Sequence, residues 1–354
     1  MKKLSLLFII VLLFSAVSIV YADINEELLK ASGKGDTGTV QALLEKGANV
    51  NAKDNYGQPV LKLAVMNGHT DIVGLLIDKG ADVNAKDKNG WTALITASME
   101  VGSNTLEGQT DMVKLLIDKG ADLNAKDNMG QTALIHASVW GHTDIARLLI
   151  DKGANINAKD NNGYTALRTA VSSNRTDTVK LLIEKDADIN AKNNNGATAL
   201  IAASSFGKTD IARLLIEKGA NINTKDNDGH TALMWASNSG HFDIVRLLIK
   251  KGADIHAKNN EGRTALILAS EGGYTEIVKL LLEEGADINA KIFNGATALV
   301  LASAYGHTDM VKLLIEKGAD IKATAQGGYT ALKMASEQGH TDIVKLLKQA
   351  GAKE

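Results

Sequence analysis

A glycine that closes a polar turn recurs along nearly the whole chain at a fixed interval. It stands at Gly57, Gly90, Gly130, Gly163, Gly196, Gly229, Gly262, Gly295 and Gly328, and every step is 33 residues except one of 40. Such a period is typical of stacked supersecondary units rather than of one compact core. The length of 354 residues agrees with this, because it exceeds what one core usually spans.

One full repeat, residues 128–160, reads "NMGQTALIHASVWGHTDIARLLIDKGANINAKD". Thr132 is a favourable N-cap for a first helix, and Gly141 can take the left-handed conformation that ends it. Thr143 is expected to cap a second helix, which stops at Gly153. The remaining residues alternate apolar and polar side chains before an Asp-Asn-Gly turn. The repeat is therefore predicted to be helix, turn, helix and β-turn arm.

The period divides the chain into a leader and ten repeats. Residues 1–22 form a predicted signal peptide, 23–54 an N-terminal capping repeat and 326–354 a C-terminal capping repeat. The eight internal repeats span 55–87, 88–127 with an insertion, 128–160, 161–193, 194–226, 227–259, 260–292 and 293–325. Polar residues such as Glu26 and Lys348 replace apolar ones in the two end repeats, which suits outer faces that meet water.

The repeat resembles the ankyrin repeat. The resemblance rests on G-x-T-A-L-x-x-A-S in the first helix, G-H-T-D-[IM]-V-K-L-L-I in the second and G-A-D-I-N-A-K-D in the arm, and it covers residues 23–354. It implies an all-α repeat solenoid whose repeats stack in a curved array. The family's Thr-Pro-Leu-His becomes Thr-Ala-Leu with Ile, Met, Arg, Val or Lys next. We therefore expect the buried polar link usually made by that His to be missing.

Two short stretches imitate nucleotide-binding motifs. Residues 202–209, "AASSFGKT", fit a relaxed phosphate-binding loop, and residues 33–38, "GKGDTG", fit a dinucleotide fingerprint. Both align without gaps to ordinary repeats, and a predicted helix precedes 202–209 where the motif requires a strand. Cysteine is absent, and no Ser-His-Asp set can be argued. We therefore predict no enzyme activity, no cofactor and no metal site.

The recurring polar residues have structural interpretations. Five histidines in the G-H slot are expected to support the turn between the helices: His69, His142, His241, His307 and His340. The aspartates of the arm are expected to form a solvated turn ladder: Asp54, Asp87, Asp127, Asp160 and Asp226. Trp235, one turn inside a helix, is expected to pack rather than to bind a partner.

Positions that packing leaves free are the ones where partner binding is expected. In ankyrin proteins the turn tips and the ends of the first helices form a concave binding surface, and the resemblance implies the same here. Carried over by position, the turn tips contribute Trp91, Gln131, Tyr164, His230, Arg263 and Tyr329, and the helix ends contribute Met99, Trp140, Phe206 and Tyr305. Aromatic and Arg side chains are frequent interface hot spots. The alternative is that free positions accept any residue.

Two repeats depart from the pattern. The repeat 88–127 carries about seven extra residues, 101–107, which either recognise something or are neutral. In the repeat 161–193, Asn174-Arg175 replaces Gly-His and Asp186 replaces the glycine that ends the second helix. A side chain at a left-handed position is strained. This repeat is therefore predicted to be the softest joint of the array, that is, the repeat with the lowest local stability.

The N-terminus is typical of a secretory signal peptide. Lys2 and Lys3 precede the apolar stretch 4–20, and cleavage is expected after Ala22. This predicts a periplasmic or secreted protein; the alternative is an uncleaved membrane anchor through residues 4–20. The net charge of −2 provides no basic field for nucleic acid.

Together these features predict an exported, bacterial-type ankyrin-repeat protein that is monomeric and non-catalytic. It is expected to bind a protein partner in the concave groove, with no small-molecule substrate, and to meet a membrane only if residues 4–20 stay uncleaved. Two alternatives stay open. One is a secreted effector that acts on a host protein, and the other is a passive array tethered to a membrane.

Overall fold

The computed structural model describes residues 24–99 and 106–353, and it consists of two compact units, Met1–Lys185 and Asp186–Glu354. The predicted signal peptide and most of the insertion at 101–107 lie outside the described residues. Every helix within the described ranges is too short or too polar to cross a membrane.

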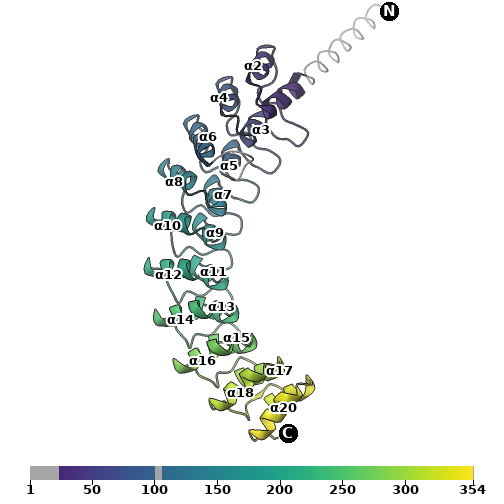
Figure 1. Cartoon of the computed structure of the whole chain (residues 1–354), viewed down its shortest axis with the longest axis vertical. Helices are drawn as coiled ribbons and strands as arrows, with labels where there is room; N and C mark the ends of the chain where they lie inside the picture. The colour runs from purple at the N-terminus through teal and green to yellow at the C-terminus, as the bar shows by residue number, and fades with distance from the viewer. Residues whose placement is uncertain (1–23, 100–105, 354) are drawn as a thin grey trace, which may run out of the picture. The chain divides into compact units, whose positions relative to one another are not determined.

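The first unit contains two rows of helices (Figure 1). Residues 24–34 are helical and belong with the first helices of the repeats, which are α3 (Val60–Met66), α5 (Ala93–Ala97), α7 (Ala133–Trp140) and α9 (Ala166–Ser172). The second helices are α2 (Thr37–Glu45), α4 (Thr70–Asp78), α6 (Leu106–Asp118), α8 (Thr143–Asp151) and α10 (Thr176–Glu184). Within this unit α7 packs against α8 of its own repeat and against α9 of the next.

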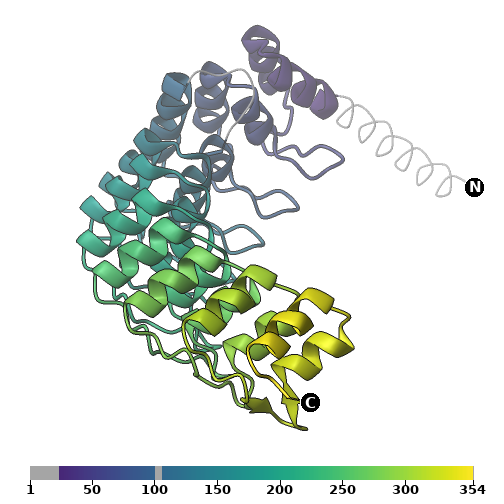
Figure 2. The same ribbon diagram turned by 60° about the horizontal axis from the view of Figure 1, so that its bottom comes forward.

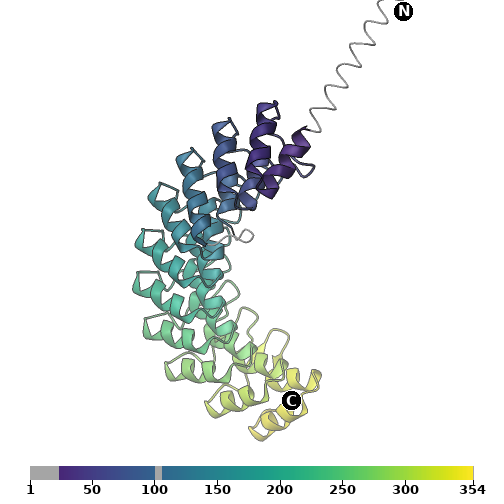
Figure 3. The same cartoon turned by 45° about the horizontal axis from the view of Figure 1, so that its top comes forward.

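The second unit repeats the arrangement. Its first helices are α11 (Ala199–Ser205), α13 (Ala232–Asn238), α15 (Ala265–Glu271), α17 (Ala298–Ala304) and α19 (Ala331–Glu337). Its second helices are α12 (Thr209–Glu217), α14 (Phe242–Lys250), α16 (Thr275–Glu283), α18 (Thr308–Glu316) and α20 (Thr341–Gln349). A short antiparallel hairpin, β1 (Thr324–Ala325) and β2 (Tyr329–Thr330), forms the last arm. Figure 3 shows the paired helices of each unit from another side. The expected all-α repeat solenoid is confirmed.

The helix ends follow from local chemistry. Thr92 caps α5 by accepting a hydrogen bond from the Ile95 N–H at 3.2 Å, which satisfies one of the unpaired donors of the first turn. Gly141 ends α7 in the left-handed conformation, with φ 77°. The prediction that Thr143 caps the second helix is wrong. Thr143 is the first helical residue of α8, and His142 takes the cap position without a side-chain cap bond.

The core lies between the two rows of helices. The Ala-Leu pair that opens each first helix is buried, as Ala133 and Leu134 show, and so is the apolar stripe of each second helix, including Ile145 and Leu149. These side chains pack within their own repeat and against the next one. An isolated repeat would leave exposed the apolar surface that the next repeat covers. Stability therefore depends on the stacking of neighbouring repeats.

The arms link successive repeats, and Figure 2 shows several of them as loops that project from the helices of the first unit. The Lys53 Nζ donates to the Lys86 carbonyl at 2.9 Å, and the Lys86 Nζ donates to the Lys126 carbonyl at 2.7 Å. In the second unit the Lys225 Nζ donates to the Lys258 carbonyl at 2.7 Å. The repeated lysines therefore connect neighbouring arms.

The histidines of the G-H slot also join repeats. The ring Nε2 of His241 lies 3.1 Å from the Ser205 carbonyl oxygen of the preceding repeat, and that of His307 lies 2.8 Å from the Glu271 carbonyl oxygen. His69 and His340 make the same contact, with Gly33 and Ala304. These four rings therefore support an inter-helix turn, as predicted, and the turn that each one contacts belongs to the preceding repeat.

Candidate functional site

Six of the predicted partner-binding residues share one place in the repeat, directly after the turn glycine. We call them the turn-exit residues: Trp91, Gln131, Tyr164, His230, Arg263 and Tyr329. In five of these repeats the backbone N–H at this position donates to the side-chain oxygen of an Asp or Asn four residues earlier. The Trp91 N–H, for example, lies 2.9 Å from Asp87 Oδ1, and the Arg263 N–H lies 2.8 Å from Asn259 Oδ1. The turn therefore fixes the side chain beside the start of the first helix.

The aspartates that hold these turns are mostly buried. The prediction of a solvated ladder is wrong for four of them, because Asp127 and Asp160 are each 7% exposed and the side chains of Asp87 and Asp226 are 3% and 6% exposed. One oxygen accepts the two backbone N–H groups of the turn. A buried carboxylate also needs a partner for its second oxygen.

The second oxygen has a different partner in different repeats. Asp87 Oδ2 pairs with the Lys62 ammonium, and both side chains are only 3% exposed. Asp127 Oδ2 lies 3.0 Å from His136 Nε2. Asp226 Oδ2 accepts the indole N–H of Trp235 at 2.8 Å. Buried polar links therefore form in these repeats, although Lys62, His136 and Trp235 make them in place of the family's His. Trp235 makes a hydrogen bond as well as packing.

Trp91 lies between cationic or ionisable side chains of neighbouring repeats. The Lys62 Nζ is 4.9 Å from the centre of the Trp91 ring, and the His136 ring meets it edge-on at 6.3 Å. Burial raises the pKa of the Asp87 carboxyl, but the Lys62 ammonium and the N–H groups of the turn outweigh burial and hold that pKa below its usual value. Trp91 is thus half-buried over an ion pair.

Other turn-exit residues also have partners within the chain. Tyr164 stacks under the guanidinium of Arg168, with 3.9 Å between Cζ and the ring centre, and burial lowers the pKa of that guanidinium. Arg263 Nε lies 3.3 Å from the Glu271 carboxylate. The Lys333 ammonium lies 4.4 Å from the centre of the Tyr329 ring.

The predicted helix-end residues are more available. Phe206 is 51% exposed, Tyr305 58% and Trp140 37%, whereas Met99 is half-buried. Each of these residues ends a first helix or directly follows one, whereas the turn-exit residues lie at the start of the first helices. The length of a first helix, about 10 Å at 1.5 Å per residue, therefore separates the two sets of predicted residues. The structure therefore places the predicted residues in two rows along the first helices of each unit and does not gather them into one cluster.

The sequence interpretation missed three exposed apolar side chains at the turn tips. Tyr56 and Met129 precede the turn glycine directly, and Phe293 lies one residue earlier. Most other repeats have a polar residue at these positions. A comparison of the tip residues between repeats would have found them.

The described residues include one group of three that could approach a metal ion. One ligand atom each from Asp226, Asp228 and His230 lies within 4.8 Å of the others. However, Asp226 Oδ1 already accepts the backbone N–H groups of Asp228 and His230, at 3.1 and 2.8 Å. The hydrogen bonds of the turn are therefore enough to bring these three residues together.

The two rows of helices, the arm ladders and the period together match one family. A family model described as Ankyrin repeats (3 copies) matches residues 28–127, 87–160, 105–193, 159–226, 190–259, 225–292 and 290–354. The chain belongs to the ankyrin-repeat family. A comparison with curated proteins found no significant match. Ankyrin repeats are generally protein–protein interaction modules, and the family is generally non-catalytic.

Proposed function

We propose that this protein is a non-catalytic, monomeric scaffold that binds a protein partner through the face that the arms and first helices form in each unit. The exposed aromatic side chains at the helix ends carry the proposal. At the position of Trp140, Phe206 and Tyr305, other repeats have polar residues such as Asn67 and Gln338. The fold therefore does not need an aromatic residue there.

Physical chemistry supports binding at these positions. Aromatic side chains dominate the energy of many interfaces because they bury a large apolar area with few rotatable bonds. The helices that present them are fixed by the core, so little conformational entropy is lost when a partner binds.

We further propose that the protein acts outside the cytoplasm. The apolar stretch 4–20, with two lysines before it and Ala22 after it, motivates export through a bacterial-type secretory signal. The mass of the N-terminus tests this directly. A mature protein that starts at Asp23 supports export with cleavage, whereas an intact Met1 contradicts cleavage and favours the membrane-anchored form.

Affinity capture from an extracytoplasmic extract tests the binding face. The tagged protein is compared with a variant in which Trp140, Tyr164, Phe206 and Tyr305 are all changed to Ala. A matched control carries four Ala substitutions at exposed positions of the second helices: Lys114, Arg147, Arg213 and Lys312. Circular dichroism checks that all three proteins are folded.

The proposal predicts a protein that is retained by the parent and by the control but is lost by the aromatic variant. Equal retention of a protein by all three proteins would indicate that the binding site lies elsewhere than on this face. Retention of no protein by the parent would favour a passive array.

A further inference from the structure

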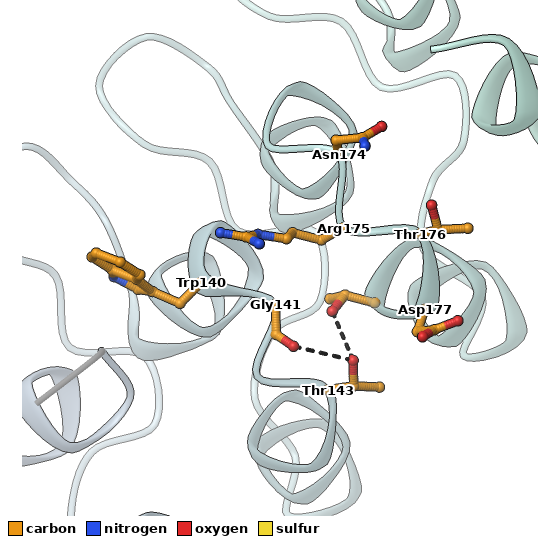
Figure 4. A pocket seen from close by; sticks show the side chains of 8 residues that line it. Trp140, Gly141, Thr143, Asn174, Arg175, Thr176 and Asp177 are labelled. Atoms are coloured by element: carbon orange, nitrogen blue, oxygen red, sulfur yellow. Dashed lines mark hydrogen bonds between the residues drawn. The ribbon is translucent and has the colours of Figure 1, made fainter. Parts of the chain in front are cut away.

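A cavity of about 330 Å³ lies in the first unit, where the inter-helix turns of the repeats 128–160 and 161–193 meet (Figure 4). Its lining residues are Trp140, Gly141, Thr143, Asn174, Arg175, Thr176, Asp177 and Thr178. The cavity therefore lies at the end of the first helices that is remote from the arms, next to the exposed indole of Trp140.

Three of these residues depart from the repeat. Asn174 replaces a glycine, Arg175 replaces the histidine of the G-H slot, and Thr178 replaces an Ile or Met. Corresponding residues such as Ile145 and Met112 are buried in the apolar core. Thr178 is only 1% exposed, so it brings a hydroxyl to a place that is elsewhere apolar. The departures make this cavity polar.

Arg175 keeps the link that the histidines make and extends beyond it. Its Nε–H donates to the Val139 carbonyl at 2.9 Å, just as the imidazole of His241 contacts the Ser205 carbonyl. Its aliphatic chain packs closely against Gly141. A Cβ added to that glycine would lie only 2.8 Å from the Arg175 Cδ. The guanidinium is thus held in place by one hydrogen bond and by packing, and its two terminal nitrogens have no hydrogen-bond or ion-pair partner among the described residues.

The other polar groups of the cavity do not neutralise this guanidinium. Thr143 Oγ1 and Thr178 Oγ1 bond to each other at 2.9 Å (Figure 4). The Asp177 carboxylate is exposed and pairs with the Lys180 ammonium at 3.4 Å. The terminal N–H groups of Arg175 are therefore available to an external acceptor.

We propose that this cavity binds the carboxylate of an acidic side chain of the partner protein, with an apolar neighbour of that side chain packed on Trp140. The inference rests on the proposed function and specifies one contact with the partner, between the Arg175 guanidinium and a carboxylate. Parallel N–H groups of a guanidinium match the two oxygens of a carboxylate, whereas the imidazole of the other repeats has no such pair. Because Arg175 and Trp140 are both exposed, a passing peptide can reach them.

The test uses two peptides that differ in one group, acetyl-Gly-Phe-Glu-Gly-amide and its Gln analogue. Binding is followed by NMR through the 15N-labelled indole signals of the three tryptophans, with Trp140→Phe to assign the reporter. We expect the Trp140 signal to shift on titration and the Glu peptide to bind about tenfold more tightly than the Gln peptide, as expected for a charge-assisted bidentate pair.

Arg175→His provides the matched variant, because it restores the residue of the other repeats and the link to Val139. It should retain the thermal midpoint of the parent and bind both peptides as weakly as the parent binds the Gln peptide. Arg175→Gln is a second variant, should the first be unstable. Equal binding of the two peptides by the parent, or unchanged affinity in a folded Arg175 variant, would overturn the inference.

Two further results separate the alternatives. If N-acetylglutamate binds as tightly as the Glu peptide, the cavity takes free acids and the peptide assignment is wrong. If the Arg175→His protein still captures the partner that the aromatic variant loses, the carboxylate contact is wrong while the proposed function stands. Loss of the partner by the second-helix control as well would instead contradict the proposed face.

Discussion

The two units use the same turn with different chemistry at its first residue. In the first unit this turn-start position is occupied by Asp54, Asp87, Asp127 and Asp160, and in the second unit by Asn193, Asp226, Asn259, Ile292 and Ala325. Asn259 accepts the two turn N–H groups at 3.0 and 2.8 Å, much as Asp87 does. A charge at this position is therefore not required by the fold.

The two units differ in the partners of the buried carboxylates at this position. Asp87 is buried with Lys62, and Asp127 is buried with His136, so the first unit contains ionisable pairs inside its stack. In the second unit Asp226 Oδ2 is satisfied by the neutral indole of Trp235, with His230 Nδ1 3.7 Å from Oδ1, and the two asparagines need no cation. One backbone turn can therefore carry either a charge-dependent or a charge-independent link between turn and helix.

The largest expected effect comes from Lys62→Met. The substitution leaves the Asp87 carboxylate buried without its cation, and we expect a loss of about 3 kcal/mol in the local free energy of unfolding. Amide hydrogen exchange in α3 and α5 measures this loss. Lys333→Met is the matched control, because Lys333 occupies the same position in the last repeat but is exposed. Equal losses in the two variants would contradict a special role of the buried Lys62–Asp87 pair.

The double substitution Lys62→Met with Asp87→Asn converts the first-unit turn into the form found at Asn259. The amide oxygen can still accept both turn N–H groups, and no buried charge is left unpaired. We expect the double variant to regain most of the loss caused by Lys62→Met, as measured by the same exchange experiment. A double variant that stays as unstable as the single one would show that Lys62 acts through packing instead.

Acidification should affect the turn at Asp87 and not the turn at Asn259. The pKa of Asp87 is lower in the folded state than its ordinary value of about 4. Its ionised form therefore stabilises the fold above that value, and this contribution is lost as pH falls through the lower, folded pKa. We expect amides of α3 and α5 to lose protection below about pH 4, whereas the asparagine amide of Asn259 does not titrate. Protection that falls equally around Asn259 would contradict this.

The smallest expected effect is at the strained positions of the repeat 161–193. Asn174 and Asp186 adopt left-handed backbone angles, with φ 58° and 61°. Asp186→Gly should raise stability by about 0.5 kcal/mol and increase the thermal midpoint, because glycine has no Cβ to strain this conformation. The reverse substitution, Gly219→Asp, should lower it at the equivalent position. An unchanged midpoint in Asp186→Gly would remove the softest-joint hypothesis.

The sequence was sufficient to predict the repeated fold because each repeat carries its own start and stop signals. Thr92 and Gly141 act within four residues of the groups that they affect, so periodicity and local chemistry determine the helices. The burial of the aspartates could not be predicted in this way. Lys62, for example, lies 25 residues from Asp87, and its partner is known only after the repeats have stacked.

The candidate site shows the same division. The positions left free by packing could be read from the repeats, but their exposure could not. Trp91 is half-buried by Lys62 and His136, whereas Phe206 is open. The cavity beside Arg175 was also missed, because it requires residues of two neighbouring repeats to meet.

The most direct test of the proposed face is site-specific photo-crosslinking. A benzophenone amino acid replaces either Phe206, at the end of α11, or Arg213, an exposed residue of α12 in the same repeat. Each protein is irradiated in an extracytoplasmic extract, and adducts are identified by mass spectrometry. We predict one protein adduct that forms at position 206 and not at position 213. An adduct that forms equally at both positions, or only at 213, would contradict partner binding through the arms and first helices.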